Sequence, residues 1–192
     1  MGLAVISMIV VLTSCAKKPQ AEIDAANAAI EAARTAEAAA YLPVEFAALQ
    51  DSLNAVMTAI TAKDSKLFKN FNAEAARLAE ITTLANTVAA NVAARKEEVK
   101  TEVSGLLTSI KTVIAENAVL IPKLPRGKEG AAVIEQIKAD VATVDAAVAE
   151  AQSLFDNGSY MDALNKITAA KEKADGLNAE VKEVLTKARI RF

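Results

Sequence analysis

Apolar residues recur along most of the chain at alternating spacings of three and four positions. With this spacing side chains return to one face of an α-helix, whereas a half-buried strand would alternate with a period of two. Glycine and proline are few, six and four in 192 residues, and most of them lie where the pattern is interrupted. The pattern therefore predicts an all-α protein whose long helices each bury one apolar stripe.

The interruptions separate five expected helices after an N-terminal apolar segment. Pro19 suits a first helical turn, and Pro43 should end the first helix because it pushes the preceding residue out of the helical conformation. Lys63-Asp64-Ser65 is interpreted as a turn with capping residues for the next helix. Gly158 should cap the fourth helix, with Ser159 and Asp162 forming a capping-box variant for the fifth. The expected ranges are about 19–40, 43–62, 66–118, 131–155 and 160 to near the end.

The expected helix at about 66–118 is much longer than the others. Its apolar stripe continues in one register from Phe71 to Val113 and becomes polar at Lys96, inside the charged run Arg95-Lys96-Glu97-Glu98. We therefore expect an elongated antiparallel bundle in which two three-helix bundles, 19–96 and 97–192, share this helix. The same stripes could be buried between chains, so a homo-oligomer is an open alternative.

Composition argues against most catalytic chemistry. The chain has no histidine and one cysteine, which removes the usual metal ligands and the usual general base. Its 22 basic and 24 acidic residues are interspersed, without the basic stripe of a nucleic-acid-binding protein. Aromatic residues make up only 4% of the chain and alanine about a fifth, so stability must come from closely packed helices. We expect no enzyme activity, no metal or other cofactor, and no nucleic-acid partner.

The N-terminus carries a motif of a different kind. An apolar segment of about 13 residues, Gly2 to Ser14, is shorter than the roughly 20 residues that a membrane-spanning helix needs and has the size of a secretory signal. It ends in Leu12-Thr13-Ser14-Cys15, which resembles a bacterial lipobox. That resemblance implies cleavage between Ser14 and Cys15, an S-diacylglycerol and N-acyl group on Cys15, a signal peptide at 1–14 and a lipidated tether at 15–18.

The lipobox resemblance also implies a location. Bacterial lipoproteins with a non-acidic residue after the cysteine generally reach the outer membrane, and Ala16 stands at that position. The expected place is the periplasmic face of the outer membrane, with the membrane itself as a partner through the lipid. The segment before the apolar run is only Met1-Gly2, without the usual Lys or Arg, so a start upstream of Met1 stays open.

Residues 19–92 resemble an alanine-rich helical domain of unknown function found in Gram-negative envelope lipoproteins. The junction Tyr41-Leu42-Pro43-Val44-Glu45-Phe46 carries the most specific part of this resemblance, with Leu42 where that family has alanine. The family implies a periplasmic helical lipoprotein and brings no catalytic residue.

Two functions follow as hypotheses. The first is a helical spacer, scaffold or accessory subunit of an envelope complex, with protein partners that the sequence does not identify. The second is a periplasmic binding or chaperone-like module that presents a helical groove to a peptide or lipid. It rests on residues 155–164, whose Gly158, Tyr160 and Ala163 are spaced as in the turn of a tetratricopeptide repeat; a single turn of this kind falls short of the three or so copies that such repeats need.

Overall fold

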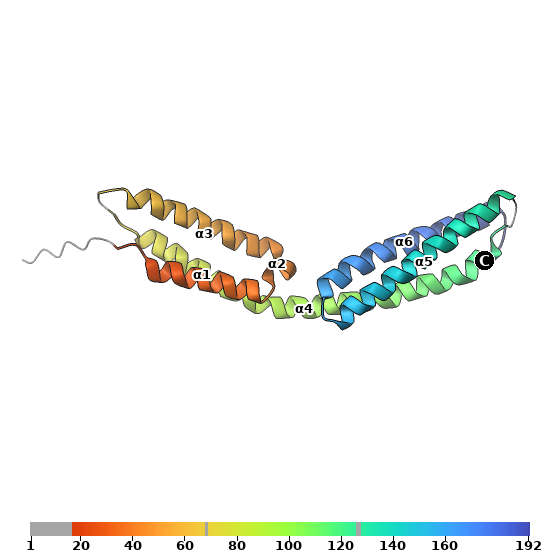
Figure 1. Cartoon of the computed structure of the whole chain (residues 1–192), viewed down its shortest axis with the longest axis horizontal. Coiled ribbons are helices and arrows are strands. Elements are labelled where there is room, and N and C mark those ends of the chain that lie inside the picture. Colours follow the sequence, from red (N-terminus) through yellow and green to blue (C-terminus); the bar gives the residue numbers. More distant parts are fainter. Residues whose placement is uncertain (1–16, 68, 126–127) are drawn as a thin grey trace, which may run out of the picture. The chain divides into compact units, whose positions relative to one another are not determined.

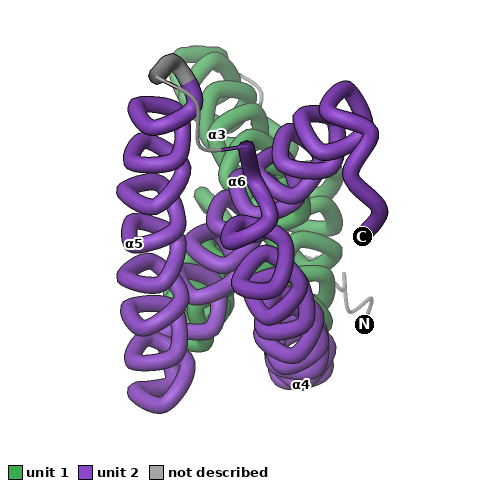
Figure 2. Tube along the Cα trace, turned by 90° about the vertical axis from the view of Figure 1, so that its right-hand side faces the viewer, with its two compact units in different colours: residues 1–92 green, residues 93–192 purple. Residues whose placement is uncertain are grey.

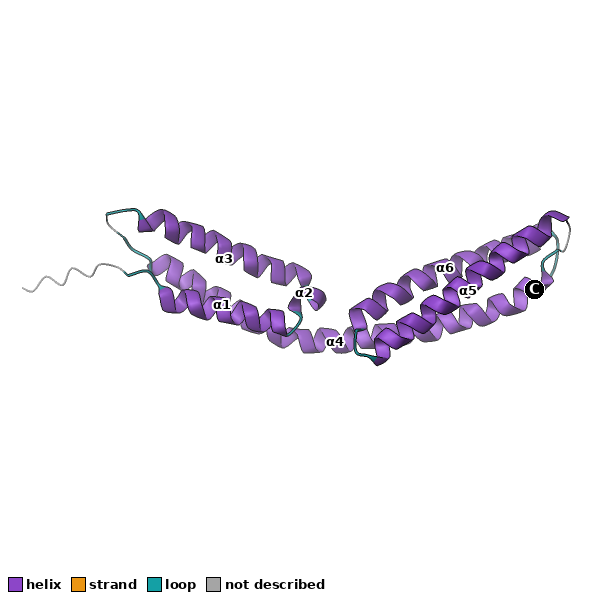
Figure 3. Cartoon of the chain, in the orientation of Figure 1, coloured by secondary structure: helices purple, strands orange, loops and turns teal. Residues whose placement is uncertain are grey.

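The computed structural model describes residues 17–67, 69–125 and 128–192. Within these ranges the chain forms six α-helices and one short 3₁₀ helix, without a strand, and this confirms the all-α prediction (Figure 3). It divides into two compact units, residues 1–92 and 93–192, and the boundary in the sequence falls within α4 (Figure 2). The elements are α1 (Gln20–Thr35), α2 (Ala38–Tyr41), α3 (Pro43–Asp64), α4 (Asn72–Leu120), η1 (Ile121–Lys123), α5 (Lys128–Asp156) and α6 (Tyr160–Lys187).

Unit 1 packs α1, α2 and α3 with the first part of α4 (Figure 1). Small side chains at the buried positions of α1 let the neighbouring helices approach closely, as the alanine content predicts. Arg34 of α1 places its guanidinium 5.7 Å from the ring centre of Phe46 in α3, which adds a cation–π contact at the edge of this core. The buried apolar residues include Ile23, Ala26, Ile30, Ala33, Phe46, Leu49, Val56, Ile60, Phe71, Leu78, Ile81, Ala85 and Val92.

The first expected helix, 19–40, is interrupted. It ends at Thr35, and Glu37 adopts a left-handed conformation with φ 71° and ψ 28° before α2 begins. Such a conformation costs a residue other than glycine about 1 to 3 kcal/mol. The change of direction accompanies full burial of Ala38 and near-complete burial of Tyr41, and the apolar area removed from water there can offset that cost. The helix after it begins at Pro43, as expected.

The long helix begins at Asn72, later than the expected 66. Lys63-Asp64-Ser65 ends α3 instead of capping α4, and the N–H of Lys66 donates to the carbonyl of Lys63 there. The first N–H group of α4, that of Asn72, donates a hydrogen bond to the side-chain oxygen of Asn70 at 2.9 Å. This is the local hydrogen bond through which asparagine favours turns and helix starts.

Unit 2 packs the second part of α4 with α5 and α6 (Figure 2). Ion pairs join α5 to α6 along their length, between Lys166 and Glu150 and between Lys173 and Asp140, both at 2.7 Å. After Leu120 the chain turns back through η1, and Leu124 closes the end of the core. The buried core at this end consists of Leu120, Leu124, Ile137, Val181 and Leu185.

The turn between α5 and α6 confirms one capping prediction and corrects another. Gly158 has a φ of 83°, and the N–H groups of Gly158 and Ser159 donate to the carbonyls of Phe155 and Leu154, which is the Schellman arrangement. The Ser159 side chain makes no capping hydrogen bond. The predicted capping box of Ser159 with Asp162 is therefore wrong, because the glycine turn already sets the start of α6.

Candidate functional site

The one residue to which the sequence assigns a chemistry, Cys15, lies outside the described residues, as do Leu12 and Ser14. The described chain starts at Lys17, within the expected tether. Lys17, Lys18 and Pro19 line an open hollow of about 480 Å³ together with Phe71 and Asn72 at the start of α4. The expected tether therefore leaves the fold at the end of unit 1 where α3 turns into α4 (Figure 1).

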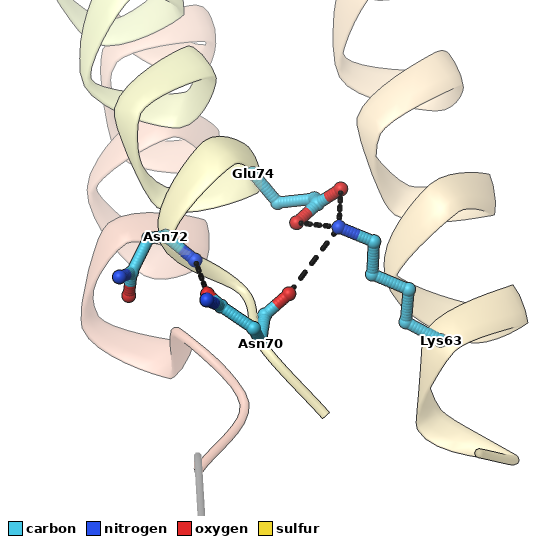
Figure 4. A network of polar contacts seen from close by, with 4 residues as sticks. All are labelled: Lys63, Asn70, Asn72 and Glu74. Atoms are coloured by element: carbon cyan, nitrogen blue, oxygen red, sulfur yellow. Dashed lines mark hydrogen bonds and ion pairs between the residues drawn. The ribbon is translucent and has the colours of Figure 1, made fainter. Parts of the chain in front are cut away.

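A buried carboxylate lies at the same end of unit 1 (Figure 4). Glu74, in the first turn of α4, is only 7% exposed, and its oxygens lie 2.7 and 2.8 Å from Nζ of Lys63 at the end of α3. The same ammonium donates to the backbone carbonyl of Asn70 at 3.2 Å. The ion pair therefore joins α3 to α4 across the turn, and its lysine also holds the turn backbone.

Two carboxyl groups of this end have shifted pKa values. The hydrogen bond from Lys63 lowers the pKa of Glu74 below its ordinary value, against the opposing effect of burial. A hydrogen bond from Lys69, at 2.7 Å, lowers the pKa of Asp64, and the charge of Lys18 contributes to this shift. Both groups are thus held as deprotonated carboxylates. A carboxylate can form an ion pair, but it has no proton to donate in acid catalysis.

A second polar network lies inside unit 2. Asn117 of α4 is 2% exposed and Asn178 of α6 is 9% exposed, and the side-chain N–H of Asn178 donates to Oδ1 of Asn117 at 2.8 Å. Asn178 also donates to Glu116 at 3.1 Å, and Glu116 pairs with Lys182 at 2.7 Å. The hydrogen bond from Lys182 lowers the pKa of Glu116. A buried polar pair of this kind fixes the relative register of two helices.

The tetratricopeptide-like turn lies beside an open hollow of about 690 Å³. Phe155 lines this hollow, and its ring centre lies 5.4 Å from that of Tyr160, while Nζ of Lys100 lies 5.9 Å from the Tyr160 ring centre. The α4 side of the hollow is lined by short or charged residues: Glu97, Lys100, Thr101, Ser104, Gly105, Thr108 and Ser109. The hollow is wide and open, and most of the residues that line it are exposed, unlike the concave pockets that enclose most of a small molecule.

Neither network resembles a catalytic or metal centre. In the parts of the chain that the structure describes, no group of three or more Asp, Glu, Cys or His residues is placed to hold a metal ion. Every buried side-chain nitrogen or oxygen there has a hydrogen-bond partner. The arrangement serves to hold helices in register, and it leaves no buried polar atom directed at a missing ligand.

Residues 72–123 contain an 18-residue window with a mean hydropathy of 1.3 and are long enough to cross a membrane. Core helices of water-soluble bundles pass the same test. The apolar positions of this segment, such as Leu78, Val99 and Ile110, are fully buried against other helices of the two units. In that 18-residue window 22% is buried inside the fold, so the helix has one buried face and one exposed face.

Only a weak sequence signal pointed to the residues of these networks. Asn117 continues the α4 apolar stripe seven positions after Ile110, so a polar residue at a buried position could have been noticed there. Asn178 and Glu74 lie beside stripe positions, and their partners, 61 and 11 residues away, become visible only in the fold.

No family model, no curated protein and no solved structure matches the chain. The resemblances to a lipobox and to an alanine-rich envelope domain therefore rest on the residues quoted above, and they serve as the starting point for a proposal.

Proposed function

We propose that this chain is a non-enzymatic lipoprotein of the bacterial outer membrane, attached through Cys15 and facing the periplasm, which acts as a helical spacer, scaffold or accessory subunit of an envelope complex. Leu12-Thr13-Ser14-Cys15, at the end of an apolar segment of signal-peptide length, is the observation that carries this proposal. Ala16 favours the outer membrane over retention in the inner membrane.

The character of the described helices supports a mechanical role. Their buried surfaces are small and regular, the ion pairs across helix contacts hold register, and buried polar atoms are satisfied within the chain. Helices with this arrangement would provide a rigid surface, and the lipid on Cys15 would attach it to the membrane. Protein partners would bind to that surface, and the exposed faces of the two units are available for them.

Metabolic labelling with a fatty-acid analogue tests the anchor. The wild-type chain should incorporate the label and fractionate with the outer membrane, and Cys15→Ala should lose both the label and membrane attachment. Ser14→Ala is a matched control, because it changes the neighbouring position while keeping a small residue before an intact cysteine. An unlabelled wild-type chain, or a Cys15→Ala variant that stays in the membrane, contradicts the proposal.

The hollow beside Phe155 favours one second candidate, a periplasmic module that binds a peptide or lipid. Phe155 would supply apolar contact, and the hydroxyl groups of α4 would supply hydrogen bonds. Native mass spectrometry of protein extracted under mild conditions distinguishes the two functions. A stoichiometric bound ligand that is lost in Phe155→Ala supports the binding module, whereas a ligand-free chain supports the spacer.

A further inference from the structure

The turn between α3 and α4 presents the most exposed apolar side chain among the large hydrophobic residues that the structure describes. Leu67 is 93% exposed and lies between Lys66 and Lys69 in the sequence. Contacts tie residues on both sides of Leu67 to each other, because Lys63 binds the carbonyl of Asn70 and Lys69 pairs with Asp64. The exposed side chain of Leu67 has an unfavourable solvation free energy, which a partner surface that covers it would recover.

Basic residues from two parts of the chain gather around this turn. Lys17 and Lys18 lie against the start of α4, and Lys18 is close enough to Asp64 for its charge to affect that carboxylate. Lys63 and Lys69 are neutralised by Glu74 and Asp64, and Glu22 lines the adjacent hollow. Lys17, Lys18 and Lys66 have no ion pair with a described carboxylate, and they leave the turn with an unbalanced positive charge.

The expected anchor brings this same end of unit 1 to the membrane. Lys17 follows Cys15 by two positions, and an extended chain covers at most about 3.6 Å per residue, so the acylated cysteine would lie within about 7 Å of the Lys17 backbone. The opposite end of unit 1, where α2 meets α3, is the far end of the 22-residue α3. Figure 1 shows the start of α1 and the α3–α4 turn at one end and α2 at the other.

We propose that the α3–α4 turn is a second membrane contact, in which Leu67 enters the lipid interface while Lys17, Lys18 and Lys66 bind anionic phospholipid headgroups. The inference rests on the proposed anchoring at Cys15, and it adds that unit 1 is docked on the surface and not free to swing on its tether. One acyl signal supported by basic and apolar groups is a common way to make membrane attachment stable.

Single-tryptophan fluorescence tests the contact, since the chain has no tryptophan of its own. The full chain carrying Leu67→Trp is mixed with phosphatidylcholine vesicles, with and without phosphatidylglycerol, and with brominated acyl chains as quenchers. Val44→Trp is the matched control, because Val44 is an exposed aliphatic residue at the opposite end of α3, 77% exposed. With phosphatidylglycerol, the Leu67→Trp emission should shift to the blue and be quenched, while the Val44→Trp emission stays that of water-exposed tryptophan.

The charge contribution is tested in the Leu67→Trp chain. Lys66→Gln should shift the equilibrium between docked and undocked turn about fivefold towards the undocked form, which is the effect of one lysine near an anionic surface. Lys111→Gln, which removes an exposed lysine of unit 2, should leave it unchanged. An equal effect of the two lysine changes overturns the part assigned to Lys66.

This experiment distinguishes a failure of the proposed Cys15 anchor from a failure of the proposed contact at Leu67. Cys15→Ser measured in parallel reports the anchor, because the variant should bind neutral vesicles less than the acylated chain. Equal fluorescence of Leu67→Trp and Val44→Trp on anionic vesicles overturns the second contact, whether or not Cys15 is acylated. A blue shift of Leu67→Trp without quenching by bromolipids also overturns it, since it would mean that Leu67 is buried against protein.

Discussion

Asn178 donates its side-chain N–H to Oδ1 of Asn117 at 2.8 Å, inside the contact between α6 and α4. Asn117 in turn donates to the backbone carbonyl of Ala174 at 3.4 Å, a long and weak hydrogen bond. Each asparagine thus depends on the other helix for its hydrogen bonds. A shift of α6 along α4 would leave buried amide groups without partners, so the pair selects one register among those that the alanine-rich surfaces allow.

Removing both members of this pair should cost less than the two single removals added together. Asn117→Leu takes away the acceptor of Asn178 and should lower the free energy of unfolding by about 1 to 3 kcal/mol. Asn117→Leu combined with Asn178→Leu should cost less than the sum of the two single changes, because no amide is then left unsatisfied. Urea unfolding of the three variants gives the coupling energy. Simple additivity would mean that the two side chains contribute independently.

The ion pair of Glu74 with Lys63 predicts a pH dependence of stability. Because the folded protein lowers the pKa of Glu74 below its ordinary 4.5, the stabilisation is fully present above that pH and is lost as the pH falls through the lower, folded value. Glu74→Gln should therefore be less stable than wild type at neutral pH, and the difference should shrink in acid. Thermal unfolding across the acid range measures it.

Glu80→Gln is the control for this prediction, because Glu80 is an exposed glutamate of the same helix. Its stability difference from wild type should stay small at every pH. If the stability difference between Glu74→Gln and wild type is as large in acid as at neutral pH, the stabilisation does not come from the ion pair of Glu74 with Lys63.

Two glycines of unit 2 should respond to alanine in opposite directions. Gly158 has a φ of 83° with open space around it, so Gly158→Ala meets no clash, and its cost of about 1 to 2 kcal/mol comes from the left-handed backbone alone. Gly176 lies inside α6, also in open space and without a positive φ, so Gly176→Ala should stabilise by roughly 0.5 to 1 kcal/mol. Chemical denaturation of both variants checks the signs. Destabilisation by Gly176→Ala would contradict the helical geometry assigned there.

Two leucines of α4 in unit 1 differ in burial and can be compared directly. Leu78 is fully buried and Leu84 is 56% exposed, although both belong to the same helix. Leu78→Ala should cost about 2 to 5 kcal/mol through lost burial and the cavity left behind, whereas Leu84→Ala should change stability by about 0.5 kcal/mol or less. Urea midpoints compare them directly. Equal losses would place Leu84 in a contact, such as one with a second chain, that the isolated chain lacks.

Spacing along the sequence was enough to predict the helices and the faces they bury. A spacing of three and four positions places apolar residues on one face of a helix. In α1 the residues of that face are all buried: Ile23, Ala26, Ile30 and Ala33. The start of α3 followed from the constraint that Pro43 places on Leu42, and the glycine cap followed from Gly158.

Features that depend on contacts between distant residues could not be predicted in this way. The break at Glu37 accompanies burial of Ala38 and Tyr41, and their spacing alone also fits an unbroken helix. The late start of α4 depends on Asn70 and on the reach of Lys63 across the turn. Leu67 was expected inside the helix at 66–118, and its exposure in the turn follows from the later start of α4.

The N-terminal peptide of the mature protein tests the central claim most directly. Trypsin digestion of the protein isolated from membranes should release Cys15-Ala16-Lys17, and mass spectrometry should find it carrying a diacylglycerol group and an amide-linked acyl chain. An unmodified Cys15, or a peptide that reads through the bond between Ser14 and Cys15, would contradict the account.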